Sequence, residues 1–218
     1  MSNKTNSDTT RKVTDGVIRN KERTRQKMID AVGEVLKEKG YAGLSINNIV
    51  NKAKVDRRLI NLYFGDVNTL IEEYLNSRDY WMSKVAPKLQ AIMDQSEGFG
   101  QNEIISILHT MYDEVSVSPD LQKILNWEIS EYQVKLRELA DNREALGKEV
   151  FKITDKDFKD TTINLRAILA LQIAGIYYLI LHAKSNGSTF CEIDINTAQG
   201  EKAIKEALAT VIGLVYKR

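Results

Sequence analysis

Apolar residues recur at helical spacing along most of the chain. Between residues 19 and 39 they fall three or four apart, on one face of a helix. Gly40 follows directly and suits a helix C-cap, while Lys37 and Lys39 place cations in the last turn, where the helix dipole favours them. The pattern predicts an amphipathic helix that ends before Gly40. Its apolar stripe consists of Met28, Ile29, Val32, Val35 and Leu36.

Two short helical patterns and a longer one follow. Ser45 is a suitable N-cap for the first, which has apolar residues at i, i+3, i+4 and i+7 from Ile46. Asp56 is a suitable N-cap for the second, residues 57–64, in which Ile60 and Phe64 form a buried pair. A fourth helix is predicted from about residue 67 to 81.

The rest of the chain consists of further helical patterns with weak breaks. The last two strong patterns cover residues 161–183 and 197–216, and Asn186-Gly187 signals a turn between them. Only 2 prolines and 12 glycines occur in 218 residues, too few for the many turns of an all-β fold. The sequence therefore predicts an all-α protein. The other breaks fall at Pro87, Gly98–Gly100, Ser118-Pro119 and about residues 154–160.

The longest apolar run, Ala167 to Ala183, has two readings. It is interrupted by Gln172 and His182, and it is shorter than the ~20 residues that a membrane-spanning helix needs. The favoured interpretation is a helix buried inside the protein. The alternative is a membrane span, because basic residues flank the run. The first twelve residues lack the apolar core of a secretory signal, so a cytoplasmic location is expected.

The composition argues against several classes of site. Cys191 is the single cysteine and cannot form an internal disulfide, and the two histidines, His109 and His182, make no zinc-binding cluster with it. Neither a phosphate-binding GxxxxGK[ST] loop nor a GxSxG elbow occurs. We therefore expect no catalytic residues, no metal and no cofactor.

The net charge of +1 hides an uneven distribution. Residues 1–62 contain 14 Lys/Arg and 7 Asp/Glu, whereas residues 63–218 contain 17 Lys/Arg and 23 Asp/Glu. A basic front on an acidic body indicates a polyanionic partner, although a basic terminal tail would produce part of the same asymmetry.

Two short helices joined by a tight turn and preceded by a bracing helix are typical of a helix-turn-helix. The second short helix can enter the DNA major groove when its outward side chains are long hydrogen-bond donors. Arginine can bond guanine O6 and N7, and asparagine can bond adenine N6 and N7. The outward candidates are Arg57, Arg58, Asn61 and Tyr63.

The segment at residues 45–70 reads SINNIVNKAKVDRRLINLYFGDVNTL and resembles the DNA-binding segment of the tetracycline-repressor (TetR/AcrR) family. In that family a Ser or Thr opens the second helix, an Ala-Gly-Val turn follows, and an aromatic pair ends the recognition helix. The resemblance implies a three-helix DNA-binding domain followed by a larger helical domain for ligand binding and dimerisation. We accordingly expect a disordered polar tail at 1–16, the DNA-binding domain at 17–66 and the larger domain at 67–218.

Three positions depart from the family pattern. Lys54 replaces the turn glycine, at a cost of about 1–2 kcal/mol if its backbone is left-handed. Asn61 replaces a tyrosine, and Val67 replaces a lysine that meets a phosphate in the family. Phosphate contacts are then expected from other basic residues. The predicted DNA-binding residues are Arg23, Arg25, Ser45, Asn47, Lys52, Arg57, Arg58, Asn61 and Tyr63.

The resemblance also implies dimerisation through the last two helices and a small-molecule site in the larger domain. The predicted dimer residues are Leu171, Gly175, Ala203, Ala207 and Val211, among which the small side chains allow close helix approach. The candidate pocket residues are polar or aromatic positions in apolar helices, each of which also suits ordinary core packing. They are Trp81, His109, Tyr112, Trp127, Glu128, Tyr132 and Tyr178.

These expectations combine into a transcriptional regulator. We predict a homodimeric repressor that binds double-stranded DNA at a palindromic operator and is released by a small-molecule effector. Two-fold symmetry would place the recognition helices about 34–36 Å apart, one turn of DNA. The alternative is a helical ligand carrier or protein-interaction module whose basic front binds an acidic protein rather than a specific DNA sequence.

Overall fold

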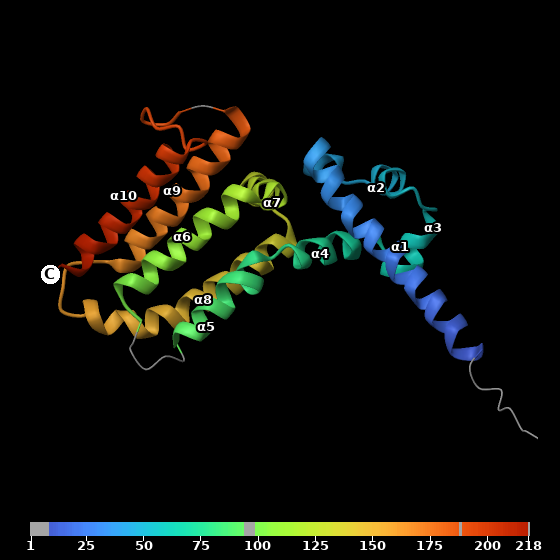
Figure 1. The fold of residues 1–218 in the computed structure, drawn as a ribbon, viewed down its shortest axis with the longest axis horizontal. Helices are drawn as coiled ribbons and strands as arrows, with labels where there is room; N and C mark the ends of the chain where they lie inside the picture. The colour runs from blue at the N-terminus through green and yellow to red at the C-terminus, as the bar shows by residue number, and fades with distance from the viewer. Residues whose placement is uncertain (1–8, 94–98, 188, 218) are drawn as a thin grey trace, which may run out of the picture. The chain divides into compact units, whose positions relative to one another are not determined.

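The computed structural model describes residues 9–93, 99–187 and 189–217. The described chain is helical, apart from turns and an isolated antiparallel bridge between Phe190 and Ile193, which confirms the all-α prediction (Figure 1). The helices are α1 (Thr9–Lys39), η1 (Tyr41–Gly43), α2 (Ile46–Ala53), α3 (Arg58–Phe64), α4 (Val67–Ser77), η2 (Trp81–Val85), α5 (Ala86–Met93), α6 (Gln101–Val117), α7 (Pro119–Ser130), α8 (Val134–Phe158), α9 (Leu165–Asn186) and α10 (Ala198–Tyr216).

The chain forms two compact units, Met1–Ser77 and Arg78–Arg218. In the first unit α1 packs against α2 and α4, and α3 packs against α4. The sequence placed residue 67 at the start of the larger domain, whereas the contacts group α4 with the helices before it. The buried side chains of this unit include Met28, Val32, Leu36, Ile49, Ile60, Leu70 and Tyr74.

Two boundaries in the first unit differ from the sequence prediction. Helix α1 begins at Thr9, so residues 9–16 are helical rather than part of a disordered tail, and residues 1–8 lie outside the described residues. No proline precedes Gly16, so nothing in the sequence prevents the helix from extending backwards. Helix α4 ends at Ser77 rather than Trp81 because Asp79 opens a new helix, accepting from the backbone N–H of Trp81 at 3.0 Å.

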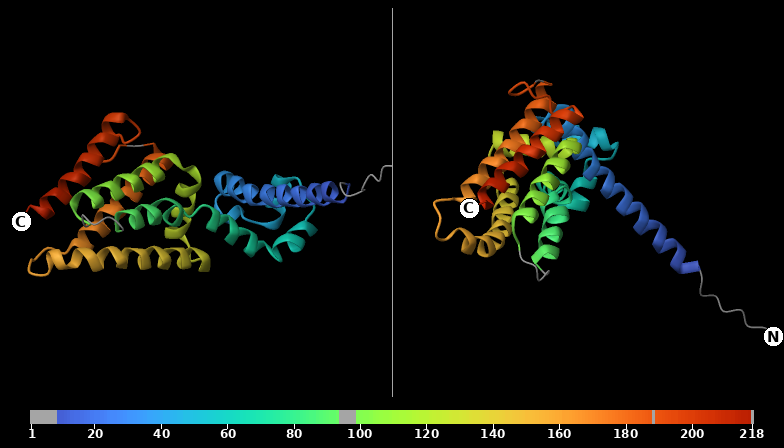
Figure 2. Two further views of the ribbon diagram at one scale, coloured as in Figure 1. Left: turned by 60° about the horizontal axis from the view of Figure 1, so that its bottom comes forward. Right: turned by 60° about the vertical axis from the view of Figure 1, so that its left-hand side comes forward.

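The second unit is built around α6, which contacts α7, α9 and α10. Helices α9 and α10 run side by side with α6, and the two further views show the same grouping (Figure 2). Ser118 and Thr197 cap α7 and α10 through their side-chain oxygens, and Gly187 ends α9 in a left-handed conformation. Pro87 lies just after the π-helical turn η2, which runs directly into α5, so the chain stays helical across this predicted break.

Helix α9 is long and apolar enough to cross a membrane by length and composition alone, and 28% of its most apolar window is buried inside the protein. One such helix is weak evidence for a span, because the core helix of a water-exposed protein passes the same test. Here Leu169, Ile176 and Ile180 are buried against the other helices of the second unit. The helix is therefore part of the core on one face.

Candidate DNA-binding site

The turn between α2 and α3 has the geometry of a helix-turn-helix. Ser45 caps α2, its Oγ accepting from the backbone N–H of Asn48 at 3.3 Å. Lys54 ends α2 in the left-handed region, with φ 54° and ψ 51°. Lys54 thus adopts the left-handed conformation of this turn although it is not a glycine. A side chain in this region of backbone space costs about 1–2 kcal/mol.

Helix α3 buries one face and exposes the other. Ile60 and Phe64 are 1% and 7% exposed and hold the helix against the first unit. Arg57, Arg58 and Asn61 are exposed, as the sequence predicts for outward positions. Leu62 shares this face and is 69% exposed, and it is not one of the predicted DNA-binding residues. Its position four residues after Arg58 was the available signal, because i and i+4 residues share a helix face.

Asp56 organises the start of α3. Its Oδ1 accepts from the backbone N–H of Arg58 at 2.8 Å and from Arg58 Nε at 3.1 Å, and its Oδ2 accepts from Arg58 Nη2 at 2.9 Å. The hydrogen bonds from the Arg58 side chain and backbone lower the pKa of Asp56 to about 2. The carboxylate and the guanidinium are both charged at physiological pH and form a two-pronged pair at the exposed end of the helix.

Two of the predicted DNA-binding cations hold the first unit together. Arg25 pairs with Glu73 of α4, and its guanidinium lies 5.0 Å from the centre of the Phe64 ring. Lys52 Nζ lies 2.6 Å from Glu38 Oε1, and this hydrogen bond raises the pKa of Lys52. Both side chains pair with carboxylates of the same unit and thereby stabilise it. The periodicity and the charge of the sequence did not reveal these contacts.

The remaining predicted residues are distributed over the same unit. Arg23 on α1 and Asn47 on α2 are exposed. Tyr63 is half-buried, with Lys21 Nζ 5.5 Å from the centre of its ring. At the start of α4, Asp66 accepts from the backbone N–H of Thr69 at 2.8 Å. A carboxylate therefore lies beside Val67, where the family pattern has a phosphate-binding lysine.

A comparison with protein families matches residues 29–74 to the bacterial regulatory proteins of the tetR family. The matched segment contains α2, the turn, α3 and most of α4, which together form the site described above. Residues 29–74 are thus a tetR-family segment. The resemblance of residues 45–70 to that family is thereby confirmed.

Solved structures show that the fold likeness extends beyond the matched segment. FadR from Bacillus subtilis, solved in complex with stearoyl-CoA, is 13% identical with a TM-score of 0.61, and the match covers 86% of this chain and 96% of that one. A putative tetR-family regulator from Vibrio parahaemolyticus is 19% identical with a TM-score of 0.56, covering 86% and 97%. NalD from Pseudomonas aeruginosa, the secondary repressor of a multidrug efflux pump, is 19% identical with a TM-score of 0.57, covering 87% and 95%. A search of curated proteins finds no match.

The second unit contains an apolar cavity of about 90 Å³. Helices α5, α6, α8 and α9 contribute to its wall, together with Trp81 of η2 and Phe99. Trp81 is the predicted pocket residue that lines it. The other lining residues are Leu89, Ile104, Ile107, Leu108, Met111, Gly147, Val150, Phe151, Leu169 and Ile173.

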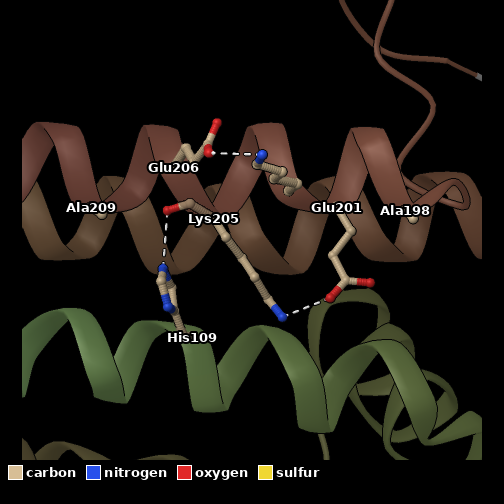
Figure 3. Close-up of a pocket in the computed structure, with 7 residues that line it drawn as sticks. His109, Ala198, Glu201, Lys205, Glu206 and Ala209 are labelled. Atoms are coloured by element: carbon tan, nitrogen blue, oxygen red, sulfur yellow. Dashed lines mark hydrogen bonds and ion pairs between the residues drawn. The ribbon is translucent and has the colours of Figure 1, made fainter.

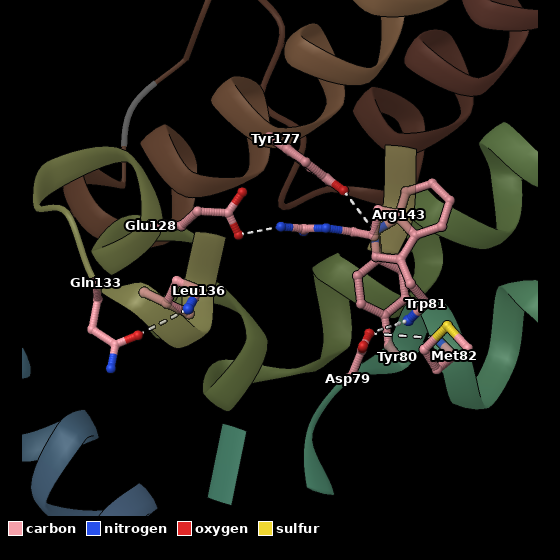
Figure 4. A network of polar contacts seen from close by, with 9 residues as sticks. All are labelled: Asp79, Tyr80, Trp81, Met82, Glu128, Gln133, Leu136, Arg143 and Tyr177. Atoms are coloured by element: carbon pink, nitrogen blue, oxygen red, sulfur yellow. Dashed lines mark hydrogen bonds and ion pairs between the residues drawn. The ribbon is translucent and has the colours of Figure 1, made fainter. Parts of the chain in front are cut away.

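A polar network adjoins this cavity through Trp81 (Figure 4). Trp81 Nε1 donates to the Tyr177 hydroxyl at 3.1 Å, and the hydroxyls of Tyr80 and Tyr177 lie 2.8 Å apart. Arg143 pairs with Glu128 beside them, with 14% and 26% of their side chains exposed. Burial raises the pKa of both tyrosines, so they stay neutral at physiological pH.

The other predicted pocket residues do not gather at the cavity. His109 Nε2 lies 3.0 Å from the backbone oxygen of Lys205, in an open groove between α6 and α10 (Figure 3). Glu128 and Tyr178 line a different open groove between α7 and α9. Tyr112 and Trp127 are buried in the core, and Tyr132 is 76% exposed outside these hollows. Of the seven candidates, Trp81 lines the cavity, and the other six are distributed over two open grooves, the core and the surface.

The predicted dimer residues lie on the outer face of α9 and α10. Leu171 is 75% exposed and Val211 is 40% exposed, and Leu214 on the same helix as Val211 is 65% exposed. A Cβ atom added to Gly175 would meet no atom within 4 Å, so this position is open on the outside of α9. Ala207 is exposed and Ala203 is half-buried. The two helices thus present apolar side chains to the outside.

The described residues contain no group of three or more His, Cys, Asp or Glu side chains that could hold a metal ion.

Proposed function

We propose that this tetR-family regulator is a homodimeric repressor that binds a palindromic operator and leaves it when a small molecule binds. The observation that carries the proposal is the exposed face of α3, where Arg58 and Asn61 project from a helix fixed by Ile60 and Phe64. Arginine and asparagine are the side chains that read guanine and adenine in the major groove. Arg23, Arg57 and Asn47 are exposed in the same unit and are suited to phosphate or base contacts.

Dimerisation is proposed through α9 and α10. The outer face of these two helices is apolar and can be covered by the same two helices of a second copy. It carries the exposed side chains of Leu171, Val211 and Leu214 and the open position Gly175. Such a two-fold interface places the same patch of each copy against the other. The resulting dimer would present two copies of α3 to successive major grooves.

The effector is proposed to be an apolar or partly apolar molecule that binds at the cavity beside Trp81. The lining side chains are almost wholly apolar, while the neighbouring hydroxyl of Tyr177 supplies a polar partner. About 90 Å³ holds only a small group, so a larger effector would favour a conformation with a wider cavity. The loss of operator affinity would equal the free energy by which the effector prefers the conformation with the wider cavity. The fold relative FadR from Bacillus subtilis was solved with stearoyl-CoA, a molecule with a long apolar chain.

Salt dependence and sequence preference together test DNA binding. A regulator should lose affinity steeply as salt rises, because counterions are released along the duplex, and should still prefer its operator over unrelated DNA. Fluorescence anisotropy with labelled duplexes between 50 and 300 mM salt measures both. Salt-sensitive binding with equal affinity for all duplexes would contradict the proposal and favour a carrier with a generic basic front.

The cavity assignment has a separate test. Ile107→Phe adds volume to the wall of the cavity and lies far along the chain from α3. We expect this variant to bind the operator as the wild type does while losing the response to apolar molecules that release the wild type. An unchanged response would place the effector elsewhere.

A further inference from the structure

We propose that Asp56 is a positioning residue, which holds the guanidinium of Arg58 so that its tip reads one guanine of the operator. This inference rests on the proposed DNA binding. Asp56 lies two residues before Arg58, the first residue of α3, and Arg57 lies between them. Arg58 has a side chain that is 91% exposed, yet three hydrogen bonds connect its backbone and side chain to Asp56.

The geometry leaves the useful edge of Arg58 available. A guanidinium carries five N–H groups in one plane. Asp56 accepts one from Nε and one from Nη2, which lie along one side of the group. The N–H groups at the tip, on Nη1 and Nη2, point away from that side, and they are the pair that can bond guanine O6 and N7.

Holding the side chain in advance also favours binding. A free arginine loses several rotamers when it binds a base, whereas a side chain already held by a carboxylate has fewer to lose. The pair is fully ionised at neutral pH, since the Arg58 hydrogen bonds keep the pKa of Asp56 at about 2. The same carboxylate repels nearby phosphates, so Asp56 is expected to raise discrimination and lower general affinity for DNA.

The test separates this role from simple helix capping. Asp56→Ser keeps a side-chain oxygen that can accept the Arg58 backbone N–H, but it cannot hold the guanidinium at two points. Duplex binding is measured for the operator and for versions with each guanine replaced in turn. A well-made arginine–guanine pair discriminates roughly 5- to 150-fold. We expect Asp56→Ser to reduce this ratio at one base pair by at least about 5-fold while binding unrelated DNA as tightly as wild type or more tightly.

Arg58→Ala provides the matched reference. The Arg58→Ala variant should lose the same base preference. The double variant, Arg58→Ala with Asp56→Ser, should show no further change in that preference. Asp56→Asn is the second variant, because it removes the charge and keeps an acceptor for the helix. Unchanged guanine discrimination in both Asp56 variants, with loss in Arg58→Ala, would overturn the positioning role alone. Absence of any preferred sequence for the wild type would instead contradict the proposed function.

A second observation carries an independent inference about Leu62. Leu62 is 69% exposed and lies on the same face of α3 as the polar side chains of Arg58 and Asn61. In the major groove only thymine presents a methyl group, and apolar side chains recognise it by contact. We infer that Leu62 contacts a thymine methyl next to the bases that Arg58 and Asn61 read.

Replacing single thymines by uracil tests this directly, because uracil lacks the methyl group and keeps every hydrogen-bonding atom. We expect one replacement to weaken wild-type binding by roughly 2- to 4-fold and to leave Leu62→Ala unaffected. Val117→Ala, a control at an exposed apolar residue in the second unit, should respond as the wild type does. Equal losses in wild type and Leu62→Ala at every thymine would overturn the inference.

Discussion

Cationic side chains in the first unit divide into those that brace it and those that face outward. Arg25 and Lys52 are bonded to Glu73 and Glu38, whereas Arg57 and Arg58 are exposed at the start of α3. All four are predicted DNA-binding residues because each is a cation near a helix-turn-helix. The bracing role of Arg25 and Lys52 is not visible in the sequence, because their partners lie 48 and 14 residues away along the chain.

The two arginines at the start of α3 should behave differently on substitution. Arg58→Ala is expected to cost about 1–3 kcal/mol of operator binding and to relax the preference at one base pair, because it removes a base contact. Arg57→Ala is the matched comparison, with an exposed arginine at the preceding position. A uniform loss on every DNA sequence for Arg58→Ala would assign that residue to phosphate binding instead. Binding curves on the operator and its single-base variants distinguish the two.

Lys54 offers a test of backbone strain. Its φ of 54° lies in the region that disfavours side chains, so Lys54→Gly should relieve about 1–2 kcal/mol. Glycine also has more conformational freedom in the unfolded chain, which offsets part of this gain. The free energy of unfolding should therefore rise by about 0.5–1 kcal/mol in total. Asn51→Gly, on the exposed side of α2, should instead lower it slightly, by about 0.3–0.5 kcal/mol, which is the difference between the helix propensities of the two residues. Urea unfolding followed by circular dichroism measures both. A loss of stability in Lys54→Gly would mean that the strain is offset elsewhere.

At the scale of helices, local signals in the sequence were sufficient for most boundaries. The hydroxyls of Ser45 and Thr197 cap α2 and α10 as their positions suggest, and Gly187 ends α9. The fourth helix was predicted too long because Asp79 was not recognised as a second start within an apolar pattern. Apolar periodicity continues smoothly across such a restart, so only the capping side chain marks it.

The packing of α1 on α4 depends on one arginine. Arg25→Ala removes the ion pair with Glu73 and the contact with the Phe64 ring, and it should lower the free energy of unfolding by roughly 1–2 kcal/mol. Arg23→Ala, at an exposed position on the same helix, should change stability by less than about 0.5 kcal/mol. Equal effects of the two substitutions in urea unfolding would remove the bracing role of Arg25.

At the scale of the whole molecule, the family of the DNA-binding segment and the all-helical class could be predicted, but the cavity could not. Residues 45–70 carry a contiguous motif, so their resemblance is visible in the sequence alone. The cavity combines side chains from residues 81 to 173, brought together only by tertiary packing. Aromatic and polar positions in apolar helices mostly serve the core, as Tyr112 and Trp127 do.

Dimerisation is tested best on the outer face of α9 and α10. Deleting α10 would also remove Leu208, Ile212 and Val215 from the core, so it cannot isolate the interface. Leu171→Asp with Leu214→Asp instead places charges on exposed positions. We expect monomers in analytical ultracentrifugation and a loss of operator affinity on the order of 100-fold or more, because the two half-sites then bind independently. Val117→Asp, another exposed position, should remain dimeric. A dimer that survives the double substitution would place the interface elsewhere.

The most direct measurement of the central claim is a selection of the purified protein against random duplex DNA at near-physiological salt, followed by sequencing. A dimeric regulator reading DNA through α3 should enrich one inverted repeat, with half-site centres about 10 base pairs, or one turn, apart or a multiple of that distance. Substituting Arg58 should change the enriched base at one position in each half-site. Recovery of DNA without any enriched sequence, or no recovery, would contradict the account of this chain as a sequence-specific repressor.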